Sequence, residues 1–414
     1  MSHTVYVLGG SQTDFAINAA RQGLGLFELM SDAVLRALDN ADLTASEIQS
    51  GHVGNFVGEL FTGQGQLGGM FEAIDPGFHG MPAGRHEAAC ASGSIALLAA
   101  TAEIEAGRYD CVLVTGVELE RNVPGAVAAQ HLGAATWVGA EAQDAKYAWP
   151  HMFHLVGEEY ERRYGLRYEH LIRIAEINIA NARRNPLAQT RAWEFTPESF
   201  TADEAANPVI DGMIRRQDCG QVTDGAAAVI LASPAFAARW GQQRGIDLGD
   251  VPRITGWGHS TAHLKLAAKL ERSAGDAYVF PHVRSAINDA FRRAEIADVF
   301  ALSGIETHDC FTATEYMAID HFGITPPGQS WQAVESGLID FKGRLPINPS
   351  GGLIGLGHPV GATGVRMVLD AAQQVSGRAG DTQVEGATRF GTLNIGGSAT
   401  TVVSFVLEGS GKTG

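Results

Sequence analysis

The feature that most constrains the fold of this chain is an alternation of strand-like and helix-like segments that runs through the sequence twice. In the first run, apolar segments at 5–8, 52–57 and 111–116 alternate with helix-like segments at 25–39 and 95–105. The segment at 111–116 shows no polar alternation, which is typical of a strand buried on both faces. Strands and helices in this order form a mostly parallel sheet with helices on its faces. The sequence therefore predicts an α/β fold.

A second run of the same kind begins at residue 224. Its strand-like segments lie at 224–231, 253–257, 305–308 and in a hairpin at 392–407 with its turn at 396–398, and its helix-like segments lie at 283–294 and 361–375. Each run places a reactive residue in a turn of small residues just before a long helix, Cys90 in the first and His358 in the second. We therefore expect two copies of one α/β unit.

The stretch between the two runs has a different character. Residues 121–216 are rich in arginine and tryptophan and show little periodicity apart from a helix-like segment at 157–182. We interpret this stretch as an inserted lobe that covers a site, although a solvated helical lobe would have the same composition. The predicted organisation is an N-terminal half (1–120 plus 217–250), a loop domain (121–216) and a C-terminal half (251–414).

Charge and cysteine content exclude several classes of protein. The formal net charge of −16 argues against binding to nucleic acids or to an anionic membrane surface. Four cysteines in 414 residues are too few for a disulfide framework and indicate free thiols. No apolar run is long enough to span a bilayer, and no signal peptide is recognised, so a cytoplasmic protein is expected.

The turn at 87–94 supplies the clearest candidate nucleophile. Cys90 lies among alanines, serine and glycine directly ahead of the helix-like segment, where free backbone N–H groups and the helix dipole favour an anion. We therefore expect a lowered thiol pKa and a reactive thiolate at Cys90.

Three groups in the second run are candidates to act with this thiol. They are the run His308-Asp309-Cys310-Phe311, the loop 355–364 that contains His358, and the turn 394–397. Imidazole can take a thiol proton and return it, and backbone N–H groups of glycine turns can form an oxyanion hole. A lone histidine or cysteine is more often a core residue, but the three groups together point to thiol catalysis.

These motifs resemble the thiolase superfamily over nearly the whole chain. The matching runs are Cys90-Ala91-Ser92-Gly93, Asp224-Gly225-Ala226-Ala227, and Asn348-Pro349-Ser350-Gly351-Gly352 followed by 357–364; His308-Asp309-Cys310-Phe311 is similar to the variant of sterol-carrier-protein-2-type thiolases. The resemblance implies a five-layered αβαβα thiolase fold, built from two duplicated halves with an inserted loop domain. It also implies an acyl-CoA C-acyltransferase that cleaves 3-ketoacyl-CoA with CoA, or catalyses the reverse Claisen condensation.

The resemblance also assigns roles to individual residues. Cys90 matches the acylated nucleophile, and His358 matches the histidine that activates it. His308 replaces an asparagine of common thiolases at an oxyanion hole, and Gly396 matches the glycine whose N–H completes a second hole with that of Cys90. Asn394 stands where common thiolases carry a second cysteine, so the acid/base role would pass to Cys310.

Binding partners follow from the same resemblance. His151 and Met152 match residues that line the pantetheine tunnel, so acyl-CoA and CoA are the expected substrates, with no metal and no permanently bound cofactor. A homodimer or homotetramer is expected, pairing at a sheet edge near 111–116, and a separate lipid-transfer chain is a possible partner. Two alternatives stay open: acyl transfer to a non-CoA acceptor, and a non-catalytic partner subunit.

Overall fold

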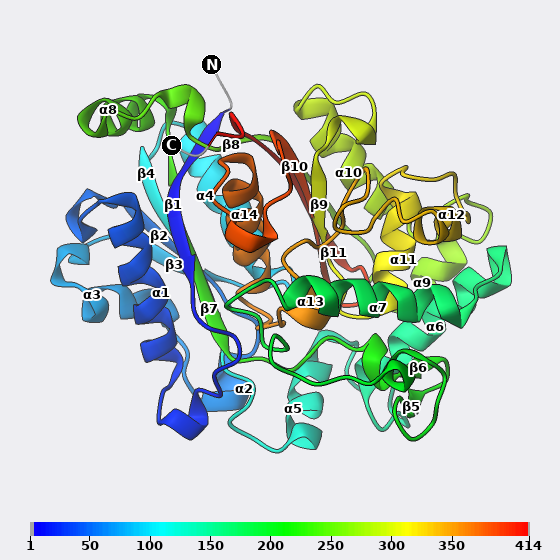
Figure 1. Cartoon of the computed structure of the whole chain (residues 1–414). Helices are drawn as coiled ribbons and strands as arrows, with labels where there is room; N and C mark the ends of the chain where they lie inside the picture. Colours follow the sequence, from blue (N-terminus) through cyan, green and yellow to red (C-terminus); the bar gives the residue numbers. More distant parts are fainter. Residues whose placement is uncertain (1–3, 413–414) are drawn as a thin grey trace.

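The computed structural model describes residues 4–412 and confirms an α/β fold (Figure 1). The strands are β1 (Val5–Gln12), β2 (Ser50–Gly54), β3 (Ala83–His86), β4 (Cys111–Glu118), β5 (Val209–Asp211), β6 (Ile214–Arg215), β7 (Gly225–Ala232), β8 (Arg253–Thr261), β9 (Gly304–Thr307), β10 (Arg389–Gly396) and β11 (Thr401–Glu408). The helices are α1 (Leu26–Ala41), α2 (Gly58–Thr62), α3 (Met70–Ile74), α4 (Ser92–Glu105), α5 (Gly125–Leu132), α6 (Ala148–Tyr164), α7 (Tyr168–Ala182), α8 (Pro234–Arg244), α9 (Leu266–Arg272), α10 (Pro281–Arg293), α11 (Thr312–His321), α12 (Ser330–Glu335), α13 (Gly352–Gly355) and α14 (Thr363–Val375).

Two half-sheets repeat one topology. Their strand orders are β2-β4-β7-β1 and β9-β10-β11-β8, with the first pair parallel and the others antiparallel in each half. The extra strand β3 extends the first half beyond β2. The halves join where β1 pairs with β8, over Val5–Ile254 and Tyr6–Arg253 alone. This repeat confirms the predicted duplication of an α/β unit.

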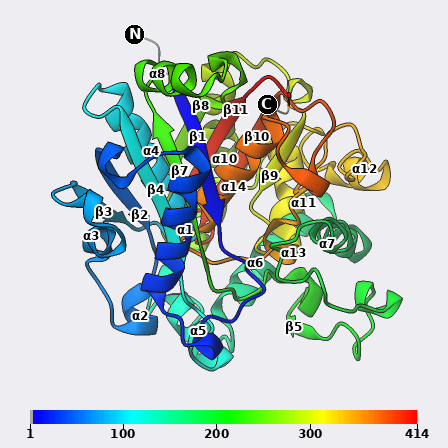
Figure 2. The same cartoon turned by 60° about the vertical axis from the view of Figure 1, so that its left-hand side comes forward.

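Side-chain alternation along the strands builds the layers. In β4, Cys111 and Leu113 enter a core that they share with α1, whereas Val112 and Val114 enter a core shared with α4 and α14. The second core also contains residues of β8 and β11, so α4 and α14 lie between the half-sheets. Helix α10 covers the outer face of the second half (Figure 2). The resulting α-β-α-β-α arrangement agrees with the five predicted layers.

Two sequence-based expectations about local structure are wrong. The segment 157–182 is not one helix, because α6 ends and α7 begins around Gly165, which has a left-handed φ of +80°. The segment 111–116 is not a sheet edge, because β4 is hydrogen-bonded to β2 on one side and to β7 on the other. The open edge of the first half is β3, which its sequence Ala83-Gly84-Arg85-His86 does not reveal as a strand.

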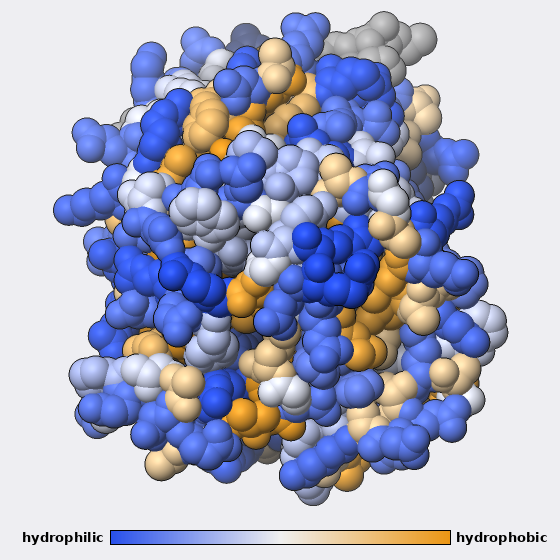
Figure 3. All heavy atoms as spheres, turned by 90° about the vertical axis from the view of Figure 1, so that its right-hand side faces the viewer, coloured by the Kyte–Doolittle hydropathy of each residue, from blue (hydrophilic) through white to orange (hydrophobic). Residues whose placement is uncertain are grey.

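No helix formed by residues 4–412 combines the length and the apolar character that crossing a membrane requires. Figure 3 shows the face over α6, α9 and α12, where hydrophobic patches are separated by hydrophilic residues.

Candidate active site

A strained turn presents Cys90 ahead of α4. Ala89 has a left-handed φ of +51°, which a residue with a side chain seldom adopts. The hydroxyl of Ser92 holds the turn, accepting from the backbone N–H of Ala88 (2.9 Å) and donating to the carbonyl of Ala89 (2.6 Å). The Glu87 carboxylate accepts the N–H of Ala89 at 2.6 Å. These bonds fix the direction of the thiol.

The turn of Cys90 meets the loop of His358 at a backbone contact. A Cβ atom at Gly93 would lie 2.7 Å from the carbonyl oxygen of Gly361, and one at Gly116 would lie 2.3 Å from the same oxygen. Only glycine fits at such an approach. The small residues of both motifs therefore bring α4 and α14, one from each half, close enough to share a site.

Hydrogen bonding sets the tautomer of His358. Its Nδ1 lies 2.6 Å from the hydroxyl oxygen of Thr363, and that hydroxyl donates its own proton to the carbonyl of Pro359 (3.0 Å). Thr363 must then accept from Nδ1–H, which leaves the Nε2 lone pair of His358 free. Burial, with a smaller effect of Arg366, lowers the pKa of His358 to about 3, so the ring is neutral.

His308 has the opposite tautomer. It follows β9, and its Nδ1 lies 3.1 Å from the amide nitrogen of Asn394. The Asn394 oxygen accepts from the hydroxyl of Ser94 (2.8 Å), so the Asn394 amide nitrogen donates to Nδ1 and the His308 proton resides on Nε2. Burial, with further effects of His358 and Arg366, lowers the pKa of His308 well below its usual range.

The structure brings Cys90, His308 and His358 together. One nitrogen of each ring lies within 4.8 Å of the other and of the Cys90 sulfur, and the rings pack edge to face with centroids 5.2 Å apart. Among residues 4–412, neither His308 Nε2 nor His358 Nε2 has a hydrogen-bond partner, and both are buried. A free lone pair and a free N–H therefore lie beside one thiol.

The expectation of a lowered Cys90 pKa is wrong. Burial raises the pKa of the thiol to about 12, and the negative charges of Glu120 and Glu118 add to this, against weaker stabilisation by the backbone N–H groups of Gly397 and Cys90. Desolvation thus outweighs the helix start. Cys90 rests as a thiol, and its ionisation needs a neighbouring base.

The tip of the β10–β11 hairpin carries a donor that the sequence did not single out. Gly397, one residue after Gly396, lines the pocket, and its backbone N–H stabilises the thiolate form of Cys90. Gly396 itself packs against the turn of Cys90, since a Cβ there would lie 2.2 Å from the carbonyl of Ala88. An oxyanion-hole role for Gly396 stays a prediction, and Gly397 is the donor that stabilises the thiolate.

A buried lysine holds this hairpin tip. Lys269 is 4% exposed, and its ammonium donates to the hydroxyls of Ser398 (2.7 Å) and Thr400 (2.9 Å). The His282 ring lies 2.7 Å from the carbonyl of Ala399. Nothing in the local sequence marks Lys269, because its partner Ser398 lies 129 residues further along the chain.

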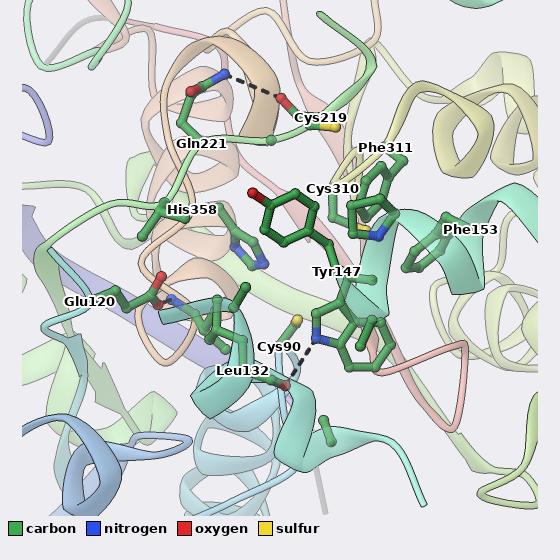
Figure 4. A pocket seen from close by; sticks show the side chains of 18 of the residues that line it. Cys90, Glu120, Leu132, Tyr147, Phe153, Cys219, Gln221, Cys310, Phe311 and His358 are labelled. Atoms are coloured by element: carbon green, nitrogen blue, oxygen red, sulfur yellow. Dashed lines mark hydrogen bonds between the residues drawn. The ribbon is translucent and has the colours of Figure 1, made fainter. Parts of the chain in front are cut away.

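The pocket above the thiol is mostly apolar (Figure 4). It has a volume of about 320 Å³, and its wall includes Phe56, Leu132, Tyr147, Trp149, Phe153, Cys219, Cys310, Phe311 and Val360. The rings of Phe153 and Phe311 stack with centroids 4.7 Å apart. Such a wall suits an acyl chain better than a charged group.

Cys310 lies on this wall, as the sequence analysis requires of an acid. Its sulfur is 3.7 Å from the hydroxyl of Thr314 and is buried. Burial, together with the nearby Cys90, raises the pKa of Cys310 well above its usual range, so the thiol keeps its proton. Cys111 is buried in β4, away from the pocket.

A CoA-binding role for His151 and Met152 stays a prediction, although neither residue lines the 320 Å³ pocket. Helix α6 contributes Ala148, Trp149, Pro150 and Phe153 to this pocket, and the large rings of Trp149 and Phe153 are four residues apart on one face. His151 lies on another face beside Asp211 (3.2 Å), and Met152 is packed in the core of the second half. The helical period of α6 would have indicated Trp149 and Phe153 had its start at Ala148 been recognised.

Comparisons with known proteins agree with this geometry. The family description "Thiolase, N-terminal domain" matches residues 5–201, and "Thiolase C-terminal domain-like" matches residues 267–409. The chain is 31% identical to an acetyl-CoA acetyltransferase of Methanothermobacter thermautotrophicus, over 98% of this chain and 99% of the relative. It is 29% identical to human sterol carrier protein 2, over 98% of this chain and 72% of the relative.

Two solved structures share the fold at 18% identity. The "Ltp2-ChsH2(DUF35) aldolase" superposes with a TM-score of 0.77 over 99% of this chain and 98% of that chain. The acetyl-CoA acetyltransferase of Syntrophomonas wolfei superposes with a TM-score of 0.70 over 99% of both chains.

Proposed function

The chain belongs to the thiolase family, and we propose that it transfers acyl groups between CoA thioesters through an acyl-enzyme on Cys90. It cleaves a 3-ketoacyl-CoA with CoA, or runs the reverse Claisen condensation. The observation that carries the proposal is that the Cys90 sulfur and one nitrogen of each imidazole lie within 4.8 Å of one another, while both Nε2 atoms are unpartnered among residues 4–412.

The first step joins the acyl group to Cys90. His358 Nε2 takes the thiol proton as the sulfur attacks the 3-keto carbon, so a thiolate forms only with substrate in place. The N–H groups of Gly397 and Cys90 stabilise negative charge at the sulfur and are placed to stabilise the oxyanion on that carbon. The carbon–carbon bond then breaks, which leaves the acyl group on Cys90 and releases the enolate of acetyl-CoA.

The second step protonates this enolate. Its oxygen accepts from His308 Nε2–H, which stabilises the developing charge, while the thiol of Cys310 donates a proton to the α-carbon. Free CoA then enters and gives its thiol proton to Cys310. Its sulfur attacks the acyl-enzyme, and Cys90 leaves and regains its proton from His358. The sum is 3-ketoacyl-CoA plus CoA to acyl-CoA plus acetyl-CoA.

Assembly and location complete the proposal. Acyl-CoA and CoA act as substrates, and no resident cofactor takes part. We propose a cytoplasmic homodimer or homotetramer, with a separate lipid-transfer chain as a further partner. The solved Ltp2-ChsH2(DUF35) aldolase, whose name joins two proteins, supports the idea that chains of this fold work with a partner.

A direct assay tests the function. Purified protein is given acetoacetyl-CoA or a longer 3-ketoacyl-CoA, with and without CoA, and loss of the ketoacyl thioester is followed. We expect CoA-dependent cleavage that Cys90→Ala abolishes and that the buried control Cys111→Ala retains. Absence of cleavage by folded wild-type protein would contradict the proposal. If Cys90 were labelled without cleavage, acyl transfer to a non-CoA acceptor would be favoured. If Cys90 were not labelled and no cleavage occurred, a non-catalytic subunit would be favoured.

A further inference from the structure

The thiol of Cys90 and the two imidazoles beside it also form a set of metal ligands. Cys90, His308 and His358 each offer one ligand atom, and these atoms lie within 4.8 Å of one another. A tetrahedral zinc ion binds sulfur and imidazole nitrogen at about 2.0 to 2.3 Å, so the ligands need to close by roughly one ångström. A thiol with two imidazoles is a soft set that favours Zn²⁺ over Mg²⁺ or Ca²⁺.

Two ring nitrogens of the site lack hydrogen-bond partners among residues 4–412. His308 Nε2 and His358 Nε2 are buried without a hydrogen bond among the described residues. Unsatisfied buried polar atoms are costly, and a bound ion removes that cost as the substrate oxygen does during turnover. The site is therefore suited to a cation whenever substrate is absent.

The groups behind the ligands support the same set. Nδ1 of His358 already donates to Thr363 at 2.6 Å, which fixes the ring with Nε2 free, as in many zinc sites. His308 needs the other tautomer, which the Asn394 amide supplies by rotating its oxygen toward Nδ1. Ser94, the present partner of that oxygen, can accept from the rotated amide nitrogen.

The surrounding charges act in both directions. Glu120 lines the same pocket as Cys90 and His358, so its carboxyl group, when ionised, attracts a cation at the sulfur. Arg366 opposes a cation, but its guanidinium is paired with Glu306 (2.9 Å) and Asp370 (2.8 Å). The Cys90 thiolate itself neutralises one of the two charges of a bound divalent ion.

We propose that Cys90, His308 and His358 bind one exchangeable Zn²⁺ ion, which occupies the site reversibly and inhibits acyl transfer. Binding releases the Cys90 proton to solvent and forms the Zn–S bond, and water completes the tetrahedron from the pocket side. The inhibition rests on the proposed thiolase function, whereas the ion site itself does not.

Equilibrium dialysis against Zn²⁺, in the presence of a non-thiol reductant, tests the site without an activity assay. We expect one ion per chain in wild type and in Cys219→Ser, a thiol on the same wall, and at least tenfold weaker binding in Cys90→Ser. Bound Zn²⁺ should also slow alkylation of Cys90 by iodoacetamide, with chelator restoring the rate. Equal affinity in wild type and Cys90→Ser, or no retained ion, would overturn the proposal.

Asn394→Asp separates the ion site from the reaction. A carboxylate accepts from Nδ1–H and fixes His308 as a ligand, so Zn²⁺ should bind about tenfold more tightly. The same change removes the Nε2–H that the reaction uses, so thiolysis should fall. Weaker Zn²⁺ binding in folded Asn394→Asp would contradict the proposal. Zinc binding at Cys90 in a protein without thiolysis would leave the ion site standing and reject the proposed function.

Discussion

Equivalent strands of the two halves end in different kinds of groups. After β2 the chain places Asn55, whose amide donates to the carboxylate of Glu118 at the end of β4 (2.9 Å), and Glu118 also accepts the N–H groups of Phe56 (2.8 Å) and Gly361 (3.0 Å). After β9, the matching strand, stands His308, bonded to Asn394 of β10 but with Nε2 unpartnered among residues 4–412. The first half closes its polar groups on one another, whereas the second leaves them open.

The comparison separates residues that hold the structure together from residues that take part in the reaction. The closed pair Asn55–Glu118 ties the first half to the loop of His358 through Gly361, so it positions the second half. The first half contributes the nucleophile Cys90, and the second contributes the base, the N–H donor and the acid. One duplicated unit thus supplies the two sides of a single reaction.

The sharpest way to break this comparison is to remove the base. His358→Asn keeps a polar side chain in the loop but has no imidazole lone pair, so kcat/KM for thiolysis should fall by about 10²- to 10⁴-fold. Steady-state assays with acetoacetyl-CoA check this, and unchanged thermal unfolding serves as the control. A loss below about threefold would mean that Cys90 does not depend on His358.

Removing the acid Cys310 should affect acylation of Cys90 and thiolysis differently. In Cys310→Ala, transfer of acetyl from acetyl-CoA to Cys90 needs no proton at carbon and should persist, whereas thiolysis should fall by about 10²-fold or more. Peptide mass spectrometry measures the acetylation of Cys90, and the assay with acetoacetyl-CoA measures thiolysis. Full thiolysis in the variant would assign the acid role elsewhere.

A change in the closed pair should affect stability instead. Asn55→Ala removes the amide bonds to Glu118 and to the carbonyl of Val117 (2.8 Å), at a site with no exposed surface. We expect the free energy of unfolding to fall by about 2 to 3 kcal/mol, measured by urea denaturation. If kcat/KM fell as far as in His358→Asn, the assignment of a purely structural role to Asn55 would be wrong.

Lys269 allows a test of a supporting residue within the second half itself. Lys269→Met keeps the volume but frees the hydroxyls of Ser398 and Thr400, so the Gly397 N–H loses its fixed direction. We expect kcat to fall by about tenfold with KM nearly unchanged, less than the effect of losing an oxyanion donor outright. Lys269→Arg, which retains donors, should recover part of the loss; an equal loss in both variants would point to packing.

The last prediction concerns the resting thiol, in the unmodified protein. Because burial raises the pKa of Cys90 to about 12, the thiolate fraction should rise about tenfold per pH unit between pH 6 and 10. The rate of iodoacetamide labelling of the Cys90 peptide should follow this slope. A plateau above pH 8 would indicate a thiol activated before substrate binds.

Local patterns carried most of the fold and the motif residues. The alternation of strands and helices predicted both halves, and the turns before the helices identified Cys90 and His358, because these depend on neighbours in sequence. Quantities set by distant packing were missed. The Cys90 pKa depends on burial and on Glu120, the support of Gly397 depends on Lys269, and the sheet edge depends on β3, a strand with almost no apolar signal.

The proposed reaction requires groups from both halves of the molecule to act on one atom, the sulfur of Cys90. The most direct measurement is peptide mass spectrometry of wild type, His358→Asn and Cys310→Ala after incubation with acetyl-CoA. We predict acetylation at Cys90 in wild type and Cys310→Ala, and little or none in folded His358→Asn. Equal labelling of Cys90 in all three proteins, or labelling at another cysteine, would contradict the account.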